Sequence, residues 1–106
     1  MINKLAEEIR ANALAKGFHE YEPRLGVGGQ DARHILSWLM LITTEVAEAA
    51  EAVRIGDVAN FGEELADVVI RVLDCAATLG IDLEKEILEK VEKNKARPIK
   101  HGGKLA

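Results

Sequence analysis

Cysteine is almost absent from this sequence. Cys75 is the only one, which excludes an internal disulfide and fits a reducing compartment. No apolar run approaches the roughly 20 residues needed to span a bilayer, because the longest extends only over residues 35–42. The N-terminal MINKLAEEIR carries two early acids and no apolar segment, so it is not a signal peptide. We therefore expect a cytoplasmic protein with no membrane partner.

Aromatic residues are also scarce: the chain has one Trp, one Tyr and two Phe. Its apolar mass is Ala, Leu, Ile and Val, which suits helices better than sheets. Four helical segments and no strand are expected, over residues 2–16, 31–54, 57–79 and 82–97. Three aspartates are expected to cap the last three of them, namely Asp31, Asp57 and Asp82. Glycines or Pro98 end the segments, and the short links favour antiparallel neighbours.

A broad basic face is missing as well, since the formal net charge is −4. This argues against a nucleic-acid partner. The body of the chain is acidic, whereas residues 93–106 hold five Lys or Arg residues, one His and no acid. At this length we expect a single domain, all-α over residues 1–106, with residues 93–106 as its basic tail. A domain of this size has a small core, so we expect it to associate with other copies.

Carboxylates follow the most apolar segment of the chain. In TEVAEAAEA, Glu45 continues a helical stripe that contains Trp38 and Leu41, and Glu48 lies three residues further on nearly the same side. In EELAD, Glu64 and Asp67 repeat the three-residue spacing. Two carboxylates on a buried stripe would be costly without a compensating cation.

Two antiparallel helices that carry these pairs would present four carboxylates to one another. An oxygen-only set without His or Cys suits Mg²⁺ or Mn²⁺, and it lacks the Glu-x-x-His of helical di-iron sites and the ligand spacing of zinc sites. The competing interpretation is a solvated acidic face, which many helices show at this spacing. The glycines of GVGG and HGGK do not form a phosphate-binding P-loop, because neither has the required spacing after a strand.

The two acidic motifs together resemble the MazG-like branch of the all-α nucleoside triphosphate pyrophosphohydrolases, which is marked by E-x-x-E on one helix and E-x-x-D on the next. The segment LGIDLEKEILEKVEKNKARPIKHGGK is similar to the fourth helix and tail of these proteins. The resemblance extends roughly from His34 to Lys104. One departure is Thr44, where the first motif of the family often begins with a further glutamate.

The resemblance implies an oligomeric four-helix MazG-like bundle, a homodimer or homotetramer, with active sites near the subunit interface. It implies Mg²⁺-dependent hydrolysis of a nucleoside or deoxynucleoside triphosphate to the monophosphate and pyrophosphate. The metal ligands would be Glu45, Glu48, Glu64 and Asp67. Glu48 and Glu64 are the catalytic candidates, and Glu48 either orients the attacking water as general base or acts only as a ligand.

Seven further residues are candidates for substrate binding: Trp38, Arg71, Lys90, Asn94, Arg97, His101 and Lys104. Trp38 either stacks on a nucleobase or packs in the core. Arg71 either contacts a phosphate or pairs with an acid. The basic residues of the tail would neutralise the leaving pyrophosphate, and Asn94 would alternatively read a base edge or sugar.

A function of a different class also stays open. A non-catalytic helical oligomer would use the same surface as a nucleotide sensor or protein-interaction module, and the missing acid at Thr44 favours it. A phosphoribosyl-ATP pyrophosphohydrolase is a third possibility within the same superfamily.

Overall fold

The computed structural model describes residues 1–98, in which four α-helices and no strand are present. They are α1 (Ile2–Ala15), α2 (Gly29–Ile55), α3 (Val58–Thr78) and α4 (Leu83–Lys95). This confirms the expected all-α class and each expected helix to within two residues at every end. None of the helices in residues 1–98 is both long and apolar enough to cross a membrane.

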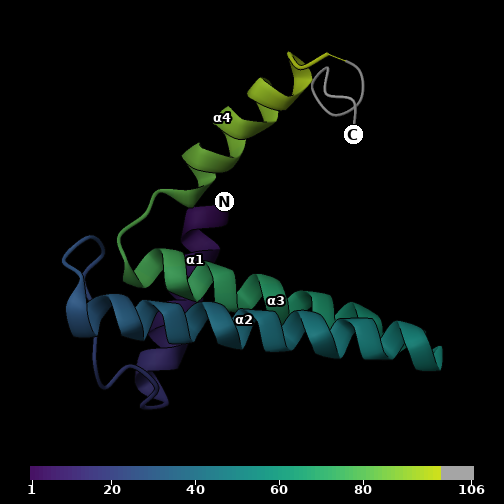
Figure 1. Ribbon diagram of the computed structural model, residues 1–106, viewed down its shortest axis with the longest axis horizontal. Coiled ribbons are helices and arrows are strands. Elements are labelled where there is room, and N and C mark those ends of the chain that lie inside the picture. The colour runs from purple at the N-terminus through teal and green to yellow at the C-terminus, as the bar shows by residue number, and fades with distance from the viewer. Residues whose placement is uncertain (99–106) are drawn as a thin grey trace.

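The centre of the fold is a hairpin of the two longest helices. Figure 1 shows α2 and α3 side by side and antiparallel, with α1 crossing behind them and packing on α3. The hairpin turns at Gly56, whose φ of 76° is left-handed, so that the Gly56 and Asp57 N–H groups return to the carbonyls of Val53 and Ala52. The Asp57 carboxylate then accepts from the Asn60 N–H and begins α3, as the sequence predicts.

The buried core is small and rich in alanine. Its members in the described residues are Ala6, Ile35, Ala49, Ala52, Leu73 and Ala76. The small side chains of these alanines let the packed helices approach closely. Leu65 and Val69, which share the apolar side of α3, stay about half exposed.

Helix α4 leaves the body of the molecule. In Figure 1 it projects away from the α2–α3 hairpin, and its main contact is with the start of α1. The joint is reciprocal: Glu84 Oε1 accepts from the Ile2 and Asn3 N–H groups, while Asn3 Oδ1 accepts from the Glu84 N–H. Asp82 caps α4 as expected, accepting from the Lys85 N–H and from Asn3 Nδ2.

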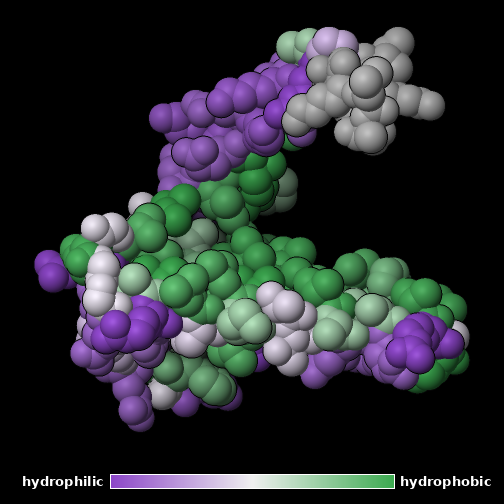
Figure 2. Space-filling model, viewed as in Figure 1, coloured by the Kyte–Doolittle hydropathy of each residue, from purple (hydrophilic) through white to green (hydrophobic). Residues whose placement is uncertain are grey.

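Because α4 stands apart, one chain is not compact. Its radius of gyration is 16.4 Å, against about 13 Å for a compact domain of this length. Figure 2 shows apolar residues gathered along the hairpin and the adjoining part of α1, and hydrophilic residues over much of α4. The bundle that the sequence predicts is thus formed within one chain only by α1, α2 and α3.

The expected cap of α2 is wrong. Helix α2 begins at Gly29, after Gly28, and Asp31 lies in its first turn. The Asp31 carboxylate instead accepts from the Tyr21 hydroxyl and from the Arg24 N–H. It therefore fastens the preceding loop to the helix, and these two hydrogen bonds lower its pKa.

Candidate metal and nucleotide site

The hairpin brings three of the four predicted carboxylates together. One oxygen from each of Glu45, Glu48 and Glu64 lies within 4.8 Å of the other two. The three belong to two helices, because Glu45 and Glu48 follow each other on one face of α2 and Glu64 lies opposite on α3. Asp67 lies one turn beyond Glu64 on α3, outside this group of three.

Glu64 has the least favourable electrostatic surroundings in the group. Its Oε2 is buried and has no hydrogen-bond partner. Burial raises the pKa of its carboxyl, and the neighbouring carboxylates of Glu48, Asp67 and Glu45 raise it further. A divalent cation would offset both the burial and the mutual repulsion.

The donor set fits a hard divalent cation. Among residues 1–98 the cluster offers only carboxylate oxygens, which are the ligands that Mg²⁺ and Mn²⁺ prefer. The buried Oε2 of Glu64 has no hydrogen-bond donor, and such an ion would take the place of one. Exposed acidic groups also occur without a metal. The observation that distinguishes this cluster from an ordinary solvent-exposed acidic surface is the buried Oε2 of Glu64, which has no hydrogen-bond partner.

A cavity of about 400 Å³ adjoins the carboxylates. Glu45 and Asp67 form part of its wall, next to Trp38 and Arg71. Its remaining lining comes from α1, the following loop, α2 and α3: Ile9, Asn12, Ala13, Phe18, His19, Leu41, Ile70, Asp74 and Cys75. The volume is within the range of small-molecule sites, so the acidic group lies at the edge of a space that can receive part of a ligand.

Trp38 is held by aromatic neighbours on both sides. His34 and His19 meet its ring edge to face, with centroids 5.3 and 5.5 Å away, and Tyr21 meets His34 in the same manner at 5.1 Å. Trp38 thus packs against side chains and also lines the cavity, so both expectations for it remain. His34 serves packing here.

His19 belongs to the site and is not among the residues predicted from the sequence. Its side chain is 7% exposed, and Nε2 lies 2.8 and 3.0 Å from the two carboxylate oxygens of Asp74. Because a carboxylate only accepts, Nε2 carries the proton and donates it. This contact joins the loop after α1 to the cavity wall. A lone His in an aperiodic loop gives no sequence signal for it.

Arg71 pairs with an acid, which was one of its two expected roles. Its Nε donates to Glu45 Oε1 over 2.9 Å, from α3 to α2. The guanidinium also lines the cavity. Arg71 therefore lies between the carboxylate group and the space beside it.

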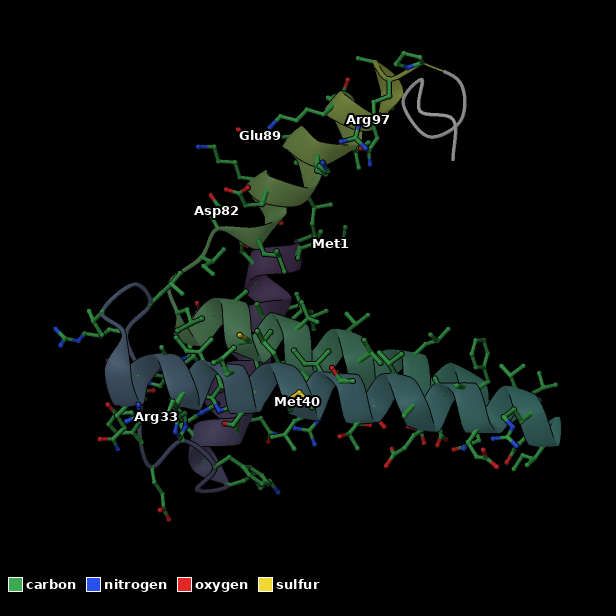
Figure 3. All side chains as sticks on the ribbon, viewed as in Figure 1. Met1, Arg33, Met40, Asp82, Glu89 and Arg97 are labelled. Carbon is green, nitrogen blue, oxygen red and sulfur yellow. The ribbon has the colours of Figure 1, made fainter. Side chains whose placement is uncertain are left out.

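The predicted residues on α4 and just after it do not reach this site in one chain. Lys90 and Asn94 are on α4, and neither they nor Arg97 line the cavity. Figure 3 shows Arg97 at the far end of α4, away from the hairpin. His101 and Lys104 lie outside the described residues.

Residues 33–101 match the family model of the MazG nucleotide pyrophosphohydrolase domain. The match covers 69 of the 106 residues and includes all four predicted carboxylates. It agrees closely with the range over which the sequence itself shows the resemblance. No curated protein and no solved structure matches the chain.

Proposed function

Since the chain belongs to the MazG nucleotide pyrophosphohydrolase family, we propose that it hydrolyses a nucleoside or deoxynucleoside triphosphate to the monophosphate and pyrophosphate. The observation that carries this proposal is the group of three carboxylates from two helices at the edge of a 400 Å³ cavity. The group would hold the divalent cation and the polyphosphate, and the cavity would hold the nucleoside.

Glu45, Glu48 and Glu64 would hold a Mg²⁺ or Mn²⁺ ion, with Asp67 as a fourth contributor. When bound, such an ion neutralises phosphate charge and polarises the phosphorus that water attacks. Without it, four carboxylates would repel a triphosphate. The unpartnered Oε2 of Glu64 supports this assignment.

Glu48 is the best candidate for the general base. It is exposed, whereas Glu45 and Glu64 are half-buried, so Glu48 can take a proton from an attacking water and return it to solvent. Glu64 is the alternative catalytic carboxylate, because its raised pKa brings it closer to the range that favours proton transfer near neutral pH. The water oxygen forms the new bond to phosphorus, and the bridging oxygen leaves with the pyrophosphate.

The cavity supplies candidates for binding the nucleoside. Trp38 offers an aromatic wall near Glu45, on which a base would stack. Arg71 would contact a phosphate.

A second copy of the chain would complete the site. Large apolar side chains are exposed along the hairpin, among them Leu36, Leu39, Met40, Val46 and Val53, and a contiguous apolar surface of this kind marks an interface. The proposed assembly is a homodimer or homotetramer. It would also bring Lys90, Asn94 and Arg97 of one chain toward the cavity of another, since they do not reach their own.

The test is turnover of a panel of ribo- and deoxyribonucleoside triphosphates with Mg²⁺ or Mn²⁺. We expect pyrophosphate release from at least one of them, and loss of about 10²- to 10⁴-fold in kcat for Glu48→Gln. Glu51→Gln is the matched control, because Glu51 is exposed on the same helix and outside the cluster. No turnover across the panel would contradict the proposal.

A nucleotide sensor remains the second candidate. It is favoured by Thr44, whose hydroxyl donates to the Met40 carbonyl of its own helix and adds nothing to the acidic group. A sensor predicts that Mg²⁺ with non-hydrolysable triphosphates raises the melting temperature while no natural triphosphate is hydrolysed. The phosphoribosyl-ATP alternative is tested by including that substrate in the panel.

A further inference from the structure

The ion pair between Arg71 and Glu45 engages one of the three clustered carboxylates. Arg71 Nε lies 2.9 Å from Glu45 Oε1, and one carboxylate oxygen of Glu45 lies within 4.8 Å of an oxygen of Glu48 and an oxygen of Glu64. The same carboxylate therefore faces a guanidinium on one side and the predicted cation position on the other.

The two partners differ in their freedom to move. The Glu45 side chain is 12% exposed, whereas that of Arg71 is 43% exposed. Glu45 is held between the helices, whereas the partly exposed Arg71 side chain can leave the pair for the adjoining cavity at small desolvation cost. In any rearrangement of this pair, Arg71 is the partner that leaves.

We propose that Arg71 is an internal counter-ion that competes with a divalent cation for Glu45 and is released into the cavity when the cation binds. This inference rests on the metal site of the proposed function. Two cations that share a carboxylate repel each other, and bringing a divalent ion to Glu45 therefore requires Arg71 to withdraw or to remain at an electrostatic cost.

Release gives Arg71 a second role. Arg71 lines the cavity beside Glu45, at the edge where the phosphates held by the carboxylate group would lie. Arginine binds phosphate through two parallel N–H groups. A withdrawn Arg71 would bind phosphate, so that cation binding and polyphosphate binding favour each other.

The competition predicts that removing the positive charge tightens cation binding in the absence of nucleotide. Even in a dielectric close to that of water, the repulsion between a divalent and a monovalent ion in contact with one carboxylate corresponds to roughly a tenfold change in affinity. Because Arg71 can withdraw, we expect Arg71→Met to bind Mn²⁺ about five- to tenfold more tightly than the wild type. Arg71→Lys keeps the charge and should stay within about twofold of the wild type.

The measurement is a Mn²⁺ titration of the full chain without nucleotide. Binding is detected by calorimetry and by the electron paramagnetic resonance signal of free Mn²⁺. Arg54→Met is the matched control, since Arg54 pairs with Glu51 on the exposed surface of α2 and should leave the affinity unchanged. Arg71→Gln is a second neutral variant, with the same expected tightening, in case the Met variant does not fold.

Tighter binding by the neutral variants, with Arg71→Lys and Arg54→Met unchanged, supports the inference. Equal or weaker binding by the neutral variants overturns it, because Arg71 would then be inert or would orient Glu45 for the cation. If those variants are unchanged while the wild type still releases pyrophosphate, only this inference fails. If the wild type binds Mn²⁺ but hydrolyses nothing, the proposed function fails and the competition stands on its own measurement. A wild type that binds no Mn²⁺ overturns the inference together with the metal site.

Discussion

Replacing Glu64 with Gln is expected to stabilise the protein in the absence of divalent cations. Burial and the neighbouring carboxylates raise the pKa of Glu64 above the ordinary 4.5. A carboxyl group whose pKa is raised by folding contributes stability below its unfolded pKa, and this contribution is lost as the pH rises through the folded value. At pH 8, well above the ordinary value, the raised pKa of Glu64 therefore costs stability, whereas a Gln amide has the same shape without the charge and can donate to Glu48.

The pH dependence separates this effect from others. The melting temperature of Glu64→Gln in EDTA should exceed that of the wild type by a few degrees at pH 8, and the difference should vanish as the pH falls below 4.5. Glu84 and Asp82 have lowered pKa values through their hydrogen bonds at the α1–α4 joint. Protonation of these two groups lowers the stability of the fold as the pH falls, but by the same amount in both proteins. Their effect therefore cancels in the difference between the two melting temperatures.

Saturating Mg²⁺ should reverse the order of the two proteins. A cation present at 100 times its dissociation constant stabilises the folded state by about 2.7 kcal/mol. At roughly 4 °C or more per kcal/mol for a domain near this size, the wild type should gain on the order of 10 °C. Glu64→Gln lacks one ligand and should gain little, so the wild type becomes the more stable protein.

Differential scanning calorimetry in EDTA and in saturating MgCl₂ measures both effects. Glu63→Gln is the matched control, because Glu63 is the exposed neighbour on α3 and is not part of the cluster; it should behave as the wild type in both buffers. The reasoning is refuted if Glu64→Gln melts below the wild type in EDTA at pH 8, or if it retains the full gain with Mg²⁺.

Three further outcomes are expected. Trp38→Leu should raise KM for the best substrate by about five- to 100-fold, which corresponds to 1–3 kcal/mol of base stacking, and Trp38→Phe should recover part of it; an unchanged KM in steady-state kinetics would restrict Trp38 to packing. Leu73→Ala, at a side chain that is 4% exposed in the core, should lower the free energy of unfolding in urea by about 2–5 kcal/mol, and a loss below 1 kcal/mol would contradict its burial in the core. Met40 is 65% exposed at the middle of the hairpin (Figure 3). Met40→Glu places a charge there and should lower the molar mass measured by light scattering toward that of one chain. An unchanged mass would exclude Met40 from the interface.

The helices and the acidic group were predictable because local chemistry determines them. Periodic apolar residues and the two caps at Asp57 and Asp82 fix where α3 and α4 begin. The short turn at Gly56 then makes α2 and α3 antiparallel, so Glu45 and Glu48 meet Glu64 across the hairpin. Spacing along two helices was sufficient for that step.

Contacts made by irregular segments were not predictable. His19 reaches Asp74 over 55 residues of sequence from a loop without periodicity. Asp31 has the residue type of a helix cap, but the loop offers its carboxylate the Tyr21 hydroxyl and the Arg24 N–H. In both cases the partner is brought close only by the packing of the whole chain.

The placement of α4 depends on a tertiary joint as well. Its basic residues suggest a role beside the carboxylates, but the reciprocal hydrogen bonds of Asn3 and Glu84 fix α4 against the start of α1. The helix therefore points away from the acidic group of its own chain. The charge of α4 was therefore predictable from the sequence, but the orientation of the helix was not.

The most direct test of the proposed hydrolysis is the identity of its products. Phosphorus-31 nuclear magnetic resonance of a turned-over substrate with Mg²⁺ should show a nucleoside monophosphate and pyrophosphate in equal amounts, with neither signal appearing in EDTA or with Glu48→Gln. Orthophosphate and a nucleoside diphosphate as the first products, or product formation that is unaffected by EDTA, would contradict the assignment of the Glu45, Glu48 and Glu64 cluster as a cation-dependent pyrophosphohydrolase centre.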